Sequence, residues 1–177
     1  MDAGLTETAE VLDDEIEVRD EVRRVASIEV DPAIVAEVEQ RFDSLQAPIA
    51  AYFGRHLSGR EGAGFLRYPD GGFYRAHRDR ASVASWPDAA RRAIALVVFL
   101  NGSRDQDPDG AFAGGALRVF AGDDAIDVVP RRGMLVAFPA DLLHEVLEVV
   151  AGTRDTIVDW LYDGIAPSAN VKVRSSK

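Results

Sequence analysis

The sequence predicts an α+β fold, in which a β-sandwich or jelly-roll barrel carries an N-terminal helical layer. Two observations predict it: helix signals are confined to the first third of the chain, and about eight strand-length segments follow without intervening helices. A length of 177 residues is typical of one domain with a substantial core. We therefore expect a single domain over 1–177, with a helical part over 1–58, a jelly-roll core over 64–163 and a tail over 165–177.

The helical part contains three signals. Residues 5–25 lack glycine and proline and carry a thin apolar stripe, which indicates either a peripheral amphipathic helix or a partly frayed acidic arm. Asp31 before Pro32 predicts the start of a firmer helix, since aspartate caps helix N-termini and proline suits the first helical position. Pro48 is predicted to end that helix, and residues 49–57 to form a second, short one.

The β-rich core is predicted from strand-length segments that end at Gly, Pro or Asp. Seven of these segments are 64–68, 93–101, 115–122, 125–130, 133–139, 144–152 and 156–163. Residues 93–101 (AIALVVFLN) form a continuous apolar run, which favours a buried central strand. A polar loop is expected over 102–114.

Composition excludes several functions. The net charge of −10 argues against a nucleic-acid binder, which needs a basic surface. No segment approaches the roughly 20 apolar residues of a membrane span, and the acidic N-terminus lacks a secretory pattern. We therefore expect no nucleic-acid or membrane partner and a cytoplasmic location, while the oligomeric state stays open. The chain has no cysteine, so a metal site must use histidine and carboxylate ligands.

A candidate metal site begins at His77 and Asp79. If this segment is extended, side chains two residues apart project from the same face. His144, which opens a later strand, would complete the two-histidine, one-carboxylate set of non-haem Fe(II) oxygenases. The His-x-Asp pair alone is weak evidence, because an exposed ion pair on a hairpin would look the same in sequence.

Two further residues support a ligand pocket. Arg154 follows a turn ten residues after His144, and a hairpin would direct it toward the same interior. A buried arginine needs an anion, and its planar guanidinium suits a carboxylate. Tyr68, nine residues before His77, could offer its phenol to the same pocket. Together these residues describe a site for a dicarboxylate that also chelates a metal.

Five segments in this order resemble one family: RYPDGGFYRAHRD, LVVFLN, GGALRVF, FPADLLHEV and TRDTIVDWLYD. They are similar to the prolyl-4-hydroxylase-like branch of the Fe(II)/2-oxoglutarate dioxygenases, over residues 65–163. The resemblance implies a double-stranded β-helix (jelly roll) and an oxidoreductase that hydroxylates a C–H bond. It also implies Fe(II), 2-oxoglutarate as cosubstrate and O₂, and it allows ascorbate.

By position, the resemblance implies Fe(II) ligation by His77, Asp79 and His144. It implies that Arg154 binds the distal carboxylate of 2-oxoglutarate and that Tyr68 hydrogen-bonds this cosubstrate. A prolyl residue of a protein or peptide is the first expectation for the substrate, and a free amino acid or another small molecule is the second.

The substrate side departs from the family pattern. Residues 80–92 are short and alanine-rich, and Arg78 and Arg80 add positive charge beside the aspartate. Tyr74 and Trp86 either line a substrate entrance or pack as ordinary aromatic residues.

Three other functions are set against the hydroxylase. Trp160, which we expect in the core, stands where a nucleic-acid demethylase of this superfamily would have a second arginine. A non-catalytic jelly-roll module that senses a ligand would differ in its metal triad, which is intact here. An interaction protein built on residues 1–58 is the third alternative.

Overall fold

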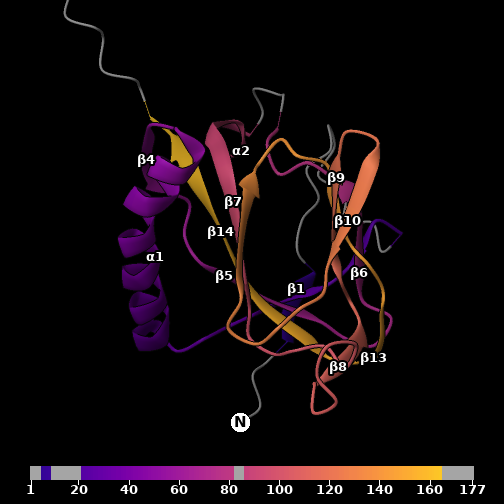
Figure 1. The fold of residues 1–177 in the computed structure, drawn as a ribbon. Helices are drawn as coiled ribbons and strands as arrows, with labels where there is room; N and C mark the ends of the chain where they lie inside the picture. The colour runs from indigo at the N-terminus through magenta and orange to yellow at the C-terminus, as the bar shows by residue number, and fades with distance from the viewer. Residues whose placement is uncertain (1–4, 9–20, 82–85, 165–177) are drawn as a thin grey trace, which may run out of the picture.

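The computed structural model describes residues 5–8, 21–81 and 86–164, which form two facing antiparallel sheets with one long helix outside them (Figure 1). The larger sheet has the order β1-β3-β5-β14-β7-β11, and β4 also pairs with β14. Its strands are β1 (Leu5–Thr8), β3 (Ala26–Ile28), β4 (Leu57–Arg60), β5 (Gly64–Tyr68), β7 (Arg92–Phe99), β11 (Leu135–Pro139) and β14 (Arg154–Asp163).

The smaller sheet has the order β10-β9-β12-β6-β2. Its strands are β2 (Arg23–Arg24), β6 (Phe73–His77), β9 (Leu117–Ala121), β10 (Asp124–Val128) and β12 (His144–Val146). A separate two-stranded sheet pairs β8 (Phe112–Gly114) with β13 (Val149–Gly152). The mostly β architecture expected from the sequence is therefore confirmed. None of the described helices is long and apolar enough to cross a membrane.

The expected central strand is confirmed as β7, which is buried at seven of its eight positions and lies between β14 and β11. Its neighbour β14 alternates between two environments, as a strand requires. Thr156 and Trp160 face the space between the sheets, whereas Leu161 packs with Ile94 in the core cluster under the long helix.

The long helix, α1 (Pro32–Phe53), begins where the sequence predicts, with the Asp31 side chain accepting a hydrogen bond from the first turn at 2.8 Å. The expected break at Pro48 is wrong, because the helix continues to Phe53 and is closed by Gly54 in the left-handed conformation. Ile49 packs against the larger sheet, so continued apolar burial offsets the N–H that proline lacks. Figure 1 shows α1 on the outer side of the larger sheet.

The helix expected over 5–25 is wrong wherever the structure describes that segment. Leu5–Thr8 forms β1 on the edge of the larger sheet, and Arg23–Arg24 forms β2 beside β6. Both are short strands that exist through pairing rather than through their own periodicity. The expectation for residues 9–20 and for the tail over 165–177 lies outside the described residues.

Two expectations about the β-rich core also need correction. A short helix, α2 (Pro87–Arg91), lies between β6 and β7, with proline at its first position. The segment 144–152, expected as one strand, forms β12 in the smaller sheet and β13 in the two-stranded sheet. Between them the Leu147 N–H donates to the carbonyl of Ala116 and the Gly115 N–H donates to the carbonyl of Glu148, both at 2.9 Å, so the two segments stay paired across the break.

Candidate metal centre

The three predicted metal ligands meet in a cavity of about 350 Å³ between the two sheets. His77 ends β6 and His144 begins β12, and these two residues are direct partners in the antiparallel ladder. Asp79 lies two residues beyond the end of β6. The sheet register therefore brings together two histidines that lie far apart in the sequence.

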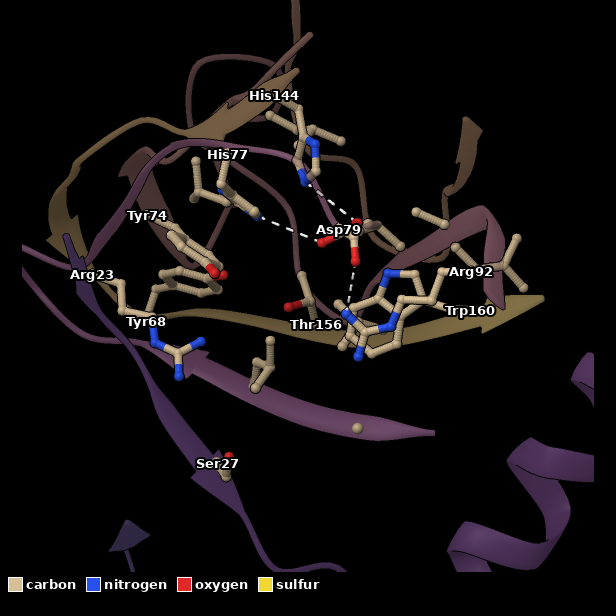
Figure 2. Close-up of a pocket in the computed structure, with 18 of the residues that line it drawn as sticks. Arg23, Ser27, Tyr68, Tyr74, His77, Asp79, Arg92, His144, Thr156 and Trp160 are labelled. Carbon is tan, nitrogen blue, oxygen red and sulfur yellow. Dashed lines mark hydrogen bonds and ion pairs between the residues drawn. The ribbon is translucent and has the colours of Figure 1, made fainter. Parts of the chain in front are cut away.

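The ligand atoms point toward one another (Figure 2). The Nε2 of His77 lies 3.6 Å from Oδ1 of Asp79, and the Nε2 of His144 lies 3.5 Å from Oδ2. One potential ligand atom from each residue lies within 4.8 Å of the others. Ligands bound at about 2.1 Å and at right angles would sit about 3 Å apart, so a divalent ion fits with a small inward movement.

Backbone contacts set the protonation of both imidazoles. The Nδ1 of His77 lies 2.7 Å from the carbonyl of Arg75, and the Nδ1 of His144 lies 2.9 Å from that of Leu142. A carbonyl oxygen only accepts, so each Nδ1 carries the proton and the Nε2 of a neutral ring is free to bind a metal. This donor set suits Fe(II).

Electrostatics favour the same protonation states. Burial raises the pKa of Asp79, but contacts with the imidazoles of His77 and His144 outweigh it and lower this pKa to about 2. Burial also lowers the pKa of His144, against the opposing effect of Asp79. An ionised carboxylate beside a neutral imidazole is the state that a metal ion needs.

Arg154 and Tyr68 lie together in another part of the cavity. Arg154 is only 1% exposed, and its Cζ lies 4.7 Å from the centre of the Tyr68 ring. Among the described residues, no partner hydrogen-bonds the Nε of Arg154 or the equally buried hydroxyl of Thr156. Burial lowers the pKa of Arg154, and Tyr68 opposes that effect. These unused polar atoms form a corner that suits a carboxylate.

A glycine makes room for this corner. Gly115 has a φ of +64°, and a Cβ at this position would lie 3.1 Å from the Cδ of Arg154. The turn before β9 therefore needs glycine both for its backbone conformation and for the passage of the arginine side chain.

Aromatic residues form the remaining walls. Tyr74 and Trp86 line the cavity, and the Tyr74 ring stacks on His77 with centroids 3.5 Å apart. Burial raises the pKa of Tyr74 to about 12. Trp160, expected in the core, also lines the cavity. Trp160 is separated from Arg154 by an even number of residues along β14, so strand alternation could have placed both side chains on the cavity face.

The charged residues beside Asp79 do not line the cavity. Arg80 pairs with Asp163 at 2.8 Å, and Arg78 donates to the carbonyl of Asp141. The cavity is instead lined by Arg23 and Arg92, which sequence reasoning missed. Arg23 belongs to the unexpected strand β2, and Arg92 ends the alanine-rich segment 80–92, for which no site residue was predicted.

Comparisons with known proteins agree with this geometry. The model of the 2OG-Fe(II) oxygenase superfamily matches residues 63–162. A PKHD-type hydroxylase of Prochlorococcus marinus is 27% identical over 112 residues, which are 63% of this chain and 46% of that protein. The crystal structure of a Pseudomonas putida prolyl-4-hydroxylase is 31% identical with a TM-score of 0.66, over 83% of this chain and 75% of that one.

A second structural relative is similar in fold at lower identity. It is a prolyl hydroxylase from Trichoplax adhaerens in complex with a hypoxia inducible factor peptide fragment, 20% identical with a TM-score of 0.72, over 90% of this chain and 71% of that chain. The chain spans less than half the length of the two curated hydroxylases it matches, at 46% and 41%.

Proposed function

This chain belongs to the 2OG-Fe(II) oxygenase superfamily, and from that premise we propose that it is an Fe(II)- and 2-oxoglutarate-dependent dioxygenase that hydroxylates a C–H bond. The observation that carries the proposal is the meeting of a two-histidine, one-carboxylate set and a buried, under-partnered arginine in one cavity. Fe(II) and 2-oxoglutarate, when bound, supply the activation of O₂ that is coupled to oxidation of 2-oxoglutarate to succinate and CO₂.

Each side chain has a defined part in this proposal. His77, Asp79 and His144 would hold Fe(II), which would supply the activation of O₂. Arg154 receives the distal carboxylate of 2-oxoglutarate on its guanidinium, and Tyr68 donates a hydrogen bond to the same cosubstrate. Burial raises the pKa of Tyr68, so its phenol keeps the proton that it donates. The buried walls restrict water around the reacting groups.

For the substrate, we propose a prolyl residue of a protein or peptide. The support is the 31% identity to a prolyl-4-hydroxylase and the aromatic wall of Tyr74, Trp86 and Trp160, which suits a compact apolar ring. A free amino acid or another small molecule is the second candidate, because the cavity of about 350 Å³ has the size of a small-molecule site.

The fold is proposed in the same terms. The two facing sheets would be the halves of a double-stranded β-helix over 64–163, in one domain with α1 as an outer layer. We also propose a cytoplasmic enzyme without a nucleic-acid partner, in keeping with the net charge of −10.

An anaerobic titration tests the reaction class. Adding Fe(II) and 2-oxoglutarate should produce a visible charge-transfer band in the wild-type protein, and His77→Ala should remove it. His56→Ala is the matched control, because His56 is exposed, lies outside the cavity and should leave the band unchanged. Wild-type protein that gives neither the band nor succinate in air would disprove the proposal.

The same samples separate an enzyme from a non-catalytic binding module. A module that only senses a ligand would give the band without forming succinate. For the substrate, a panel of prolyl peptides and free amino acids would be scored by a mass gain of one oxygen. Gain confined to free amino acids would overturn the peptide assignment.

A further inference from the structure

The proposed metal ligand Asp79 lies beyond the end of β6, so no sheet ladder holds its backbone. The peptide group between Asp79 and Arg80 is instead held at both ends. Its carbonyl accepts a hydrogen bond from Nη1 of Arg92 at 3.1 Å, and its N–H donates to the carbonyl of Ala140 at 2.9 Å. These two contacts fix the plane from which the Asp79 carboxylate projects.

Both contacts lead back to the start of β7. Arg92 is the first residue of that strand, and the Ala140 N–H donates to the carbonyl of Ala93 at 2.9 Å. The ligand segment is thus tied to the most deeply buried strand of the larger sheet, although Asp79 follows a strand of the smaller sheet.

Arg92 is itself held firmly. Its side chain is buried, its Nε donates to Oε2 of Glu61 at 2.6 Å, and its Nη2 donates to the other carboxylate oxygen. Its Cζ lies 3.7 Å from the centre of the Trp160 ring (Figure 2). The Glu61 N–H in turn donates to the carbonyl of Trp160 at 2.9 Å.

These contacts decide what Arg92 does in the cavity. An unpaired guanidinium on a cavity wall would attract an anionic substrate, whereas this one is neutralised by Glu61 in a bidentate pair. The Trp160 ring covers the flat face of the guanidinium, and its remaining nitrogen, Nη1, donates to the carbonyl of Asp79. Arg92 therefore connects the ligand segment, the cavity wall and a carboxylate in one rigid unit.

We propose that Arg92 is a positioning residue, which with Glu61 aims the Asp79 carboxylate at the two imidazoles and holds Trp160 as a wall of the cavity. This inference rests on the proposed function, in which Asp79 ligates the metal. Groups that orient metal ligands in this way commonly change metal affinity by about 10- to 100-fold.

The test is the affinity for Mn(II), measured on the full chain from the EPR signal of free Mn(II), without turnover. Arg92→Met should weaken Mn(II) binding about tenfold or more. The matched control is Arg60→Met. Arg60 also forms a partly buried ion pair, with Asp159 at 2.7 Å, but lies outside the cavity. Urea unfolding of both variants reports the loss of stability that they share.

Arg92→Lys provides a second variant in case the methionine variant does not fold. A lysine ammonium is a compact donor that lacks the planar fork needed to hold Glu61 and the Asp79 carbonyl together, so we expect Mn(II) binding at least about threefold weaker. Mn(II) affinities of the folded Arg92 variants equal to that of Arg60→Met would overturn the inference alone. Wild-type protein that fails to bind Mn(II) would overturn the proposed function and the inference together.

Discussion

Replacing Arg154 with methionine should greatly weaken 2-oxoglutarate binding while costing the unliganded protein no more stability than an ordinary substitution does. Arg154 is 1% exposed, and its Nε has no hydrogen-bond partner among the described residues. Burial lowers the pKa of Arg154, which means that the cavity disfavours its charged form until an anion arrives. Methionine keeps apolar contact with the neighbouring Tyr68 and Phe99 rings and removes the buried charge.

The size of the binding loss follows from the hydrogen bonds that the guanidinium can make. A planar fork gives two hydrogen bonds to one carboxylate, and each is worth about 1.5–2 kcal/mol when a charge takes part. A loss of about 3–4 kcal/mol corresponds to roughly 100- to 1000-fold weaker binding at about 1.4 kcal/mol per factor of ten.

Calorimetric titration of 2-oxoglutarate into the anaerobic, Mn(II)-loaded protein measures this loss, and urea unfolding measures the stability of the unliganded forms. Arg67→Met is the control, because Arg67 pairs with Asp155 at 2.8 Å and does not line the cavity. Two results would refute the reasoning: binding by Arg154→Met within about tenfold of wild type, or a loss of more than about 2 kcal/mol of unliganded stability, beyond the cost of an ordinary substitution.

Three further predictions concern the surroundings of the site and the helix. Asn101 hydrogen-bonds the backbone on both sides of Arg154 at 2.9 and 3.0 Å, so Asn101→Ala should lower the unfolding free energy by about 1–3 kcal/mol and weaken 2-oxoglutarate binding; unchanged calorimetry would contradict it. Burial lowers the pKa of His144 in the folded protein. As the pH falls below the ordinary value of 6.5, the unfolded chain therefore binds a proton at this histidine more readily than the folded protein does, and the unfolding free energy falls. His144→Gln should flatten this slope in urea unfolding between about pH 6.5 and 5; an unchanged slope would count against it. Pro48→Ala should raise the unfolding free energy by about 1 kcal/mol in the same assay, by restoring a helical N–H; a loss of stability would show that the proline is needed.

The candidate metal ligands could be picked out because residues with this chemistry are rare in the sequence. With three histidines and no cysteine, few combinations could form a metal site. Arg154 was expected to reach the same interior through a hairpin with the His144 strand. It does line the cavity, but from β14 in the larger sheet, which faces the smaller sheet that holds His144. The convergence of His77 and Asp79 was expected from an extended strand, but the strand ends at His77. Beyond it, hydrogen bonds to the Asp79 carbonyl and from the Arg80 N–H hold the backbone in place of a sheet ladder. Such a contact depends on Arg92, whose position relative to Asp79 no local pattern encodes.

The errors in the fold have a common physical cause. Strands β1 and β2 contain four and two residues, too few to show periodicity, and they form because a neighbouring edge offers hydrogen-bond partners. The extension of α1 through Pro48 likewise depends on the sheet beneath Ile49. In each case a tertiary contact outweighs a local preference, so a window of sequence cannot reveal the outcome.

Because β14 contributes side chains to two different environments, the protein should be sensitive to any change in the number of residues in this strand. Arg154, Thr156 and Trp160 face the cavity, while Leu161 on the alternate face packs under α1. Side-chain substitutions at the cavity positions could retune the ligand without disturbing the helix layer. Deleting or inserting a single residue inside β14 would exchange the two faces beyond that point. We therefore expect that substitutions in this strand can change ligand specificity. A change in the register with which β14 pairs with its neighbours should not be tolerated.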